Sequence, residues 1–244
     1  MKQDSCDAIT LAANTRPLTL ASTHSEMIQH YTTTTAPRKF ANPAPLGLAS
    51  FAATTFVLSL FNLQTQGIKT ENLIVSMAFG YGGLVQILAG MWEFACGNTF
   101  GATAFSSYGG FWISFGLILY PNSGILAAYA TKKNELESAL GLFLFSWFIF
   151  TTMMLLGSLR TSVALVTLFF FLDVTFLLLA LGKLCAESDA LTKAGGVFGV
   201  ITAFIAWYTA AAGLLEAENS YIRLPTISLG DKPANDDALT DRKD

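Results

Sequence analysis

The sequence predicts an all-α membrane protein, a bundle of six transmembrane helices, on the basis of three observations. Of its 244 residues, 52% are hydrophobic and only 13% are charged, which is about half the charged fraction that is usual in soluble domains. Most of the charges stand near the two ends of the chain and in short connecting segments. Six apolar stretches are each long enough to cross a bilayer, which takes about 20 helical residues.

The six predicted spans follow one another closely along the chain. We place them at Pro45–Gln64, Asn72–Trp92, Gly101–Pro121, Ser138–Leu159, Thr161–Gly182 and Ala194–Leu215. Short connections make consecutive helices antiparallel neighbours, and an even number of crossings brings both chain ends to one side. The chain then divides into a disordered tail over 1–40, a transmembrane domain over 41–225 and a second disordered tail over 226–244.

Each span has a feature of its own besides its length. The first follows Asn42 and two prolines, which can cap a helix and open its first turn. The second, third and sixth carry several glycines, which let helix backbones approach closely. The fourth comes after the longest and most charged link, 122–137, and only Arg160 separates it from the fifth. The fifth holds the one charge that we place inside a span, Asp173.

Polar side chains recur on single faces of the first three spans. Thr55 lies on such a face in the first span, and Gln86 lies on one in the second that ends at Glu93. In the third span a polar run begins at Thr103 and ends at Tyr108. Two explanations fit: hydrogen bonds between helices, worth about 0.6–2 kcal/mol each, or a narrow pathway lined by hydroxyls, amides and rings. The residues alone leave both open.

Two acidic residues are candidates for a special role. An aspartate at the centre of a membrane raises the free energy of insertion by about 2.5–3.5 kcal/mol, so such residues usually face a cavity or a partner. Asp173 is in this position, and Glu93 lies just beyond the predicted end of the second span. We expect each to serve either in proton coupling or as a structural hydrogen-bond acceptor.

Chemistry other than transport has little support in the sequence. The two histidines, His24 and His30, lie in the N-terminal tail, and Cys6, Cys96 and Cys185 are far apart, so we expect no metal site. The chain has no phosphate-binding loop and no nucleophile motif. A net charge of −3 without a long basic run argues against nucleic-acid binding. We therefore expect no catalytic residues and no cofactor.

Two motifs resemble those of the acetate uptake transporter family, the YaaH-like group that includes bacterial succinate–acetate permeases and fungal acetate transporters. One is Asn42-Pro-Ala-Pro-Leu-Gly-Leu48, and the other runs from Gly97-Asn-Thr-Phe to Tyr108-Gly. The resemblance implies a protomer of a homo-hexamer in the plasma membrane, each protomer passing acetate and similar short monocarboxylates through its own pathway. The N-terminal tail looks like that of fungal members, which implies that both termini are cytoplasmic. The positive-inside rule does not choose a side here.

The resemblance also implies the residues of the pathway. A constriction of an aromatic residue, a tyrosine and a leucine falls on Phe51, Tyr108 and Leu172. Neutral donors hold a carboxylate weakly enough for release. We expect such donors at Asn42, Thr55, Gln86, Asn98 and Thr103. Whether protons are partners in a symport, or the pathway is an anion channel, is left open. The alternatives are an acetate- or ammonium-responsive sensor and an ammonium exporter.

Overall fold

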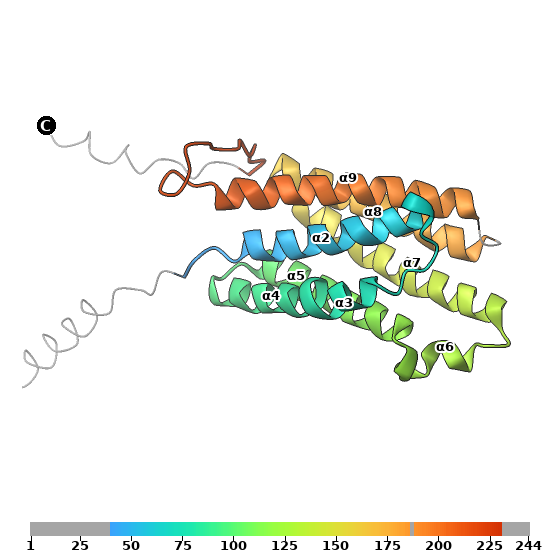
Figure 1. Cartoon of the computed structure of the whole chain (residues 1–244). Helices are drawn as coiled ribbons and strands as arrows, with labels where there is room; N and C mark the ends of the chain where they lie inside the picture. The colour runs from blue at the N-terminus through green and yellow to red at the C-terminus, as the bar shows by residue number, and fades with distance from the viewer. Residues whose placement is uncertain (1–39, 186–187, 231–244) are drawn as a thin grey trace, which may run out of the picture. The chain divides into compact units, whose positions relative to one another are not determined.

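The computed structural model describes residues 40–185 and 188–230, so most of both predicted tails lies outside the described residues. In the described part, six helices are long and apolar enough to cross a membrane. They lie alongside one another in a bundle (Figure 1). The predicted fold class, an all-α membrane protein with six transmembrane helices, is confirmed.

The helices of the spans have the following bounds. They are α2 (Ala44–Asn62), α3 (Ile74–Phe79), the π-helical turn η2 (Gly80–Val85), α4 (Gln86–Ala95), α5 (Thr99–Leu119), α7 (Lys133–Ser158), α8 (Val163–Leu184) and α9 (Asp189–Leu214). The segments α3, η2 and α4 form one continuous span, Ile74–Ala95. Short helical turns occupy two connections: η1 (Thr65–Gly67), η3 (Pro121–Ser123) and α6 (Ile125–Ala128).

Two differences from the predicted boundaries concern charged residues. The second span continues to Ala95, so Glu93 lies inside a helix, and our placement of it beyond the span was wrong. The helix continues past the carboxylate because the first left-handed residue is Gly97, with φ of 78°. At the other end of the bundle, α7 begins at Lys133 rather than Ser138, because charged residues can extend a helix into the polar interface.

The helices alternate in direction, which gives the bundle two distinct ends. We call end A the end where α2 begins and α9 ends, and end B the end where α2 ends and α9 begins (Figure 1). Helix α2 packs against α9 and the second span, α9 against α8, α8 against α7, and α4 against α5. Large aromatic side chains join α5 to α7, for example Phe111 to Phe143 and Trp147.

The chain after α9 lies across the α7–α8 turn at end A. The Val163 amide donates to the Ile227 carbonyl at 2.9 Å, and the Leu229 amide donates to the Thr161 carbonyl at 3.0 Å. The Tyr208 hydroxyl also donates to the carbonyl of Pro225 at 2.6 Å. Residues 226–230, which we assigned to the disordered tail, therefore make backbone hydrogen bonds with the transmembrane domain.

Glycines on α9 bring it into close contact with α2. A Cβ atom placed on Gly196 would lie 2.9 Å from the backbone oxygen of Ser59 and 2.9 Å from Cγ of Leu63. Such contacts are shorter than a real Cβ makes, so only glycine fits here without a shift of the backbone. The glycine therefore sets the distance between the two helices, as expected for close packing in a membrane.

Replacing Gly196 by alanine should destabilise the bundle by about 1–3 kcal/mol, the usual penalty of overpacking. Thermal unfolding of the purified protein in detergent should show a lower Tm. The control is Gly110→Ala on α5, where an added Cβ would have no atom within 4 Å. A Gly196→Ala protein as stable as the Gly110→Ala protein would contradict this account of the α2–α9 contact.

Candidate functional site

Two cavities lie inside the bundle, one toward each end, and the same two residues line both. Cavity A, of about 270 Å³, lies toward end A between Pro45, Glu93 and Ser162. Cavity B, of about 370 Å³, lies toward end B. Phe51 and Leu172 line both cavities, and their side chains are buried. These two side chains therefore stand between the cavities.

Tyr108 reaches the same place from α5. Its ring centroid lies 5.8 Å from that of Phe51, and its hydroxyl lies 2.9 Å from Oγ1 of Thr151. Because the Thr151 hydroxyl donates to the carbonyl of Trp147, the tyrosine is the donor to Thr151. Its ring is also in contact with the rings of Trp147, Phe150, Phe169 and Phe176.

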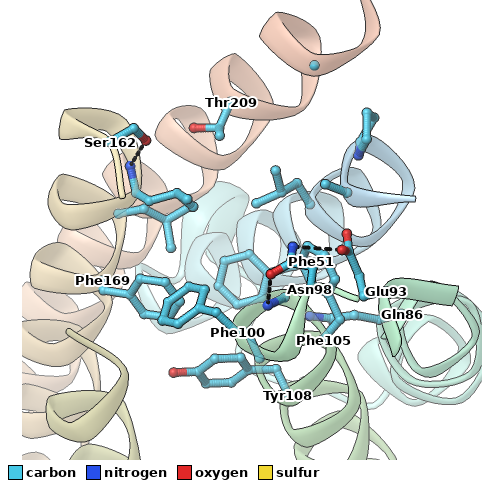
Figure 2. A pocket seen from close by; sticks show the side chains of 18 of the residues that line it. Phe51, Gln86, Glu93, Asn98, Phe100, Phe105, Tyr108, Ser162, Phe169 and Thr209 are labelled. Carbon is cyan, nitrogen blue, oxygen red and sulfur yellow. Dashed lines mark hydrogen bonds between the residues drawn. The ribbon is translucent and has the colours of Figure 1, made fainter. Parts of the chain in front are cut away.

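All three residues of the predicted constriction therefore line cavity A, from α2, α5 and α8. Figure 2 shows Phe51 and Tyr108 among the aromatic side chains of this cavity. Tyr108 is only 3% exposed, so its hydroxyl needs a partner inside the protein. Thr151 meets that need, and the hydrogen bond fixes the ring beside Phe51. That these residues limit passage stays a prediction.

A buried carboxylate faces cavity A. The side chain of Glu93 is 2% exposed, and its Oε2 accepts a hydrogen bond of 2.7 Å from Nδ2 of Asn98 (Figure 2). Oδ1 of Asn98 accepts from the amide of Gly101 at 3.1 Å and so caps α5. Oε1 of Glu93 has no hydrogen-bond partner in the described part of the chain. One oxygen of the carboxylate is therefore fixed and the other is unpaired.

Gly101 is necessary for this arrangement. A Cβ atom at this position would lie 2.6 Å from Nδ2 of Asn98 and 3.0 Å from the carboxyl carbon of Glu93. The second sequence motif therefore contains both the cap of α5 and the glycine that leaves room for Glu93. Asn98, which we had expected to contact a substrate, thus has a structural function as well.

Three helices begin at the same end as cavity A. Ala44 at the start of α2, Gly101 in the first turn of α5 and Ser162 before α8 all line it. The Ser162 hydroxyl accepts from the amide of Leu165 at 3.3 Å and caps α8. Helix N-termini carry partial positive charge and favour anions. Cavity A thus combines three such termini with one carboxylate.

The structure brings some of the other predicted donors to the cavities and not the rest. Thr55 lines cavity B and Gln86 lines cavity A. Both are buried, and Oγ1 of Thr55 and Oε1 of Gln86 lack partners among the residues described. Asn42 is exposed and accepts from the amide of Ala44 at 3.1 Å, as a helix cap would. Thr103 lines neither cavity.

Asp173 does not line either cavity. Its Oδ1 accepts a hydrogen bond of 3.0 Å from Oγ1 of Thr152, which joins α8 to α7. Of the two roles that the sequence left open for Asp173, the structural one fits this position. Glu93 is instead the acidic residue that lines cavity A.

A group of charged residues that we did not predict from the sequence lies at end B. Nζ of Lys183 lies 2.8 Å from Oε2 of Glu137, and Lys69, Glu71 and Lys183 line cavity B. Burial is the main cause that raises the pKa of Glu71 above its usual range. The positive charge of Lys183 opposes this rise, and the negative charge of Glu137 adds to it. Since the spans alternate in direction, the positions of these residues at the ends of successive helices could have indicated a common location.

Six membrane-spanning helices around two cavities that meet at buried side chains are the architecture of a transporter or a channel. The chain matches the GPR1/FUN34/yaaH family over residues 13–231 and belongs to that family.

Its relatives include fungal and bacterial proteins. It is 52% identical to acetate permease A of Emericella nidulans, over 77% of this chain and 66% of the relative. It is also 52% identical to ammonia transport outward protein 2 of Saccharomyces cerevisiae, over 81% of this chain and 69% of the relative. This chain therefore spans about two thirds of the length of these two proteins.

The bacterial relative SatP matches in both sequence and structure. The succinate-acetate/proton symporter SatP of Escherichia coli is 38% identical, over 77% of this chain and 95% of the relative. A solved structure of the bacterial acetate channel SatP is 37% identical, with a TM-score of 0.68 over 77% of this chain and all of that chain.

Replacing Asn98 by alanine should destabilise the protein by more than the loss of a helix cap alone. The cap of α5 is worth about 1 kcal/mol, and removal of Nδ2 also leaves Oε2 of Glu93 buried without a donor, at a further 1–3 kcal/mol or so. Thermal unfolding in detergent measures both losses together. The control is Ser188→Ala, which removes only the cap of α9. Equal losses of stability would show that the bond to Glu93 contributes nothing.

Proposed function

We propose that acetate and similar short monocarboxylates cross the membrane through each protomer, passing between cavity A and cavity B. The main support is that Phe51 and Leu172 line both cavities, so only side chains stand between them. The names of its relatives acetate permease A and SatP support acetate as the substrate.

The cavities suit a small carboxylate in a way that also permits its release. Helix N-termini at cavity A and the hydroxyl of Thr55 at cavity B are neutral or only partly charged donors. Several weak sites in series let an ion enter and leave. The barrier of Phe51, Tyr108 and Leu172 offers little polar surface. It therefore admits a solute with a methyl group more readily than a strongly hydrated ion.

Proton coupling, which distinguishes a symporter from a channel, is best placed on Glu93. It lines cavity A, and its Oε1 has no partner in the part of the chain that the structure describes.

Purified protein in liposomes with labelled acetate tests both the function and the coupling. Flux that follows only the acetate gradient supports a channel, and accumulation driven by inward protons supports a symporter. Flux no greater than in protein-free liposomes would overturn the proposed function.

An ammonium exporter is a second candidate, with an observation of its own. Cavity A contains the rings of Phe51, Phe100, Phe105, Tyr108 and Phe169 together with the carboxylate of Glu93. Aromatic faces and a carboxylate can bind a small cation. The name of ammonia transport outward protein 2 agrees with this candidate. Ammonium flux without acetate flux in the same liposomes would favour it over the main proposal.

For the assembly and its setting, we propose a homo-hexamer in the plasma membrane with both termini cytoplasmic. Large apolar side chains are exposed on the outer faces of the bundle, for lipid or for other protomers, among them Leu88, Met91, Leu142, Ile149 and Phe204. Native mass spectrometry of the purified protein measures the number of protomers. A monomer or dimer as the main species would contradict the hexamer.

Two exposed cysteines allow the orientation to be measured. Cys96 follows α4 at end A, and Cys185 follows α8 at end B. With cytoplasmic termini, a membrane-impermeant maleimide added to intact cells should label Cys185 and leave Cys96 unlabelled. A Cys185→Ser variant should then lose the label. Persistent labelling of that variant, removed only when Cys96 and Cys6 are both changed to serine, would show the opposite orientation.

Phe51→Ala and Leu172→Ala should each widen the range of substrates toward longer monocarboxylates such as lactate. Both changes remove side-chain volume where the two cavities adjoin. Competition by lactate against labelled acetate uptake measures the effect. The control is Phe56→Ala, on the same helix but packed against Phe204 and Trp207, which should leave selectivity as it is. Unchanged selectivity in both test variants would contradict the constriction.

A further inference from the structure

Five charged side chains surround the end-B opening of the pathway. They line cavity B and a smaller adjoining cavity of about 150 Å³, and they are Lys69, Glu71, Glu137, Lys183 and Asp189. The connection after α2, and helices α7, α8 and α9, all contribute to them. Cavity A differs, because Glu93 is the charged residue among the described residues that line it. The two ends of the pathway therefore present different electrostatic fields to an arriving anion.

Lys183 is at the centre of this group. It lines cavity B as well as the smaller cavity, and its side chain is 34% exposed while that of Glu137 is 15% exposed. It stands in the last turn of α8, where the helix carbonyls favour a cation. Its ion pair of 2.8 Å with Glu137 holds the ammonium group beside the opening. A carboxylate entering from end B would pass this group.

We propose that this cluster is a pH-dependent capture site for the substrate carboxylate. Lys183 and Lys69 attract the carboxylate, whereas Glu71, Glu137 and Asp189 repel it, and protonation of Glu71 removes one of the three repelling charges. The inference rests on the proposed function, because it assigns the regulation of the same pathway. It makes the rate of uptake depend on pH even where no proton crosses with the substrate.

Glu71 is the acid to which we assign the pH dependence of the site. Its pKa is raised, mainly by burial; Lys183 opposes the rise and Glu137 adds to it. Glu71 therefore takes up a proton at a higher pH than an exposed glutamate does. With every group ionised, three carboxylates oppose two ammonium groups and the site repels an anion. Protonation of Glu71 makes the two signs equal, and Lys183 keeps its bond to Glu137. A falling pH therefore admits the carboxylate more easily.

Capture at an opening and proton coupling affect different measurements. A capture site changes the apparent KM for acetate, because it sets the local concentration of the anion at the opening. Coupling changes how far acetate accumulates against its gradient. Initial uptake of labelled acetate at the same pH on both sides of the membrane isolates the first effect.

The test compares Glu71→Gln with the unchanged protein in liposomes, from mildly acidic to neutral pH, after subtraction of flux through protein-free liposomes. In the unchanged protein, the apparent KM for acetate should decrease as the pH is lowered. The variant should keep a low KM throughout, about three- to tenfold below the unchanged protein at neutral pH, as expected for one charge removed a few ångströms from the path. Lys183→Gln should raise the KM across the range.

The matched control is Glu135→Gln. It removes the same charge from the same end of the bundle, but Glu135 is exposed, pairs with Lys132 at 3.2 Å and lines neither cavity. This variant should follow the unchanged protein. If Glu71→Gln does not give folded protein, Asp189→Asn serves in its place and should also lower the KM at neutral pH.

The outcomes separate this inference from the proposed function. If the Glu71→Gln and Lys183→Gln proteins carry acetate with the pH profile of the unchanged protein, the capture site is wrong and acetate transport stands. An effect of Glu135→Gln equal to that of Glu71→Gln would also overturn the site, because general surface charge would explain both. Absence of acetate flux in the unchanged protein at every pH contradicts the proposed function itself.

Discussion

The contact between Phe51 and Tyr108 is the interaction on which the interior of this protein depends. Glycines bring α9 close to α2 and α5 close to the second span, so those sides of the bundle are narrow. The side between α5 and α7 is filled instead by aromatic rings. Tyr108 can be buried at this position because the Thr151 hydroxyl accepts a hydrogen bond from the tyrosine hydroxyl. Phe51, held in contact with this ring, then lies with Leu172 between cavities A and B.

The division gives each end of the pathway its own chemistry. Cavity A has helix N-termini and a buried carboxylate held by Asn98, and cavity B opens among lysines and acids at the ends of helices. Those charges stand in the connection after α2 and near the ends of α7, α8 and α9, and the ion pair of Lys183 with Glu137 offsets part of the cost of burying them. A charge beside the rings of Phe51 and Tyr108 would have no such partner. The proposed constriction between the cavities is accordingly formed by apolar and aromatic side chains.

The sequence could predict the spans, because hydrophobic length alone identifies a membrane helix, and two motifs indicated Phe51 and Tyr108. It could not predict which polar groups meet. The bond between Glu93 and Asn98 depends on the left-handed Gly97 between them, and our predicted span ended at Trp92, one residue before Glu93. The charged group at end B depends on how four elements pack, which no single stretch of sequence contains. The hydrogen bonds of residues 226–230 had no sequence signal that we recognised.

The cost of a charge in a membrane also explains why Asp173 and Glu93 differ. Both are acids within spans, but Asp173 lies between α7 and α8 with a hydroxyl donor, while Glu93 lies against a cavity with one oxygen unpaired. Asp173 lines neither cavity, so a solute in the proposed pathway would have no contact with its carboxylate. Glu93 lines cavity A, and its second oxygen could take up a proton while the first keeps its bond to Asn98. We therefore assign the proposed role in transport by position relative to the cavities, more than by depth in the membrane.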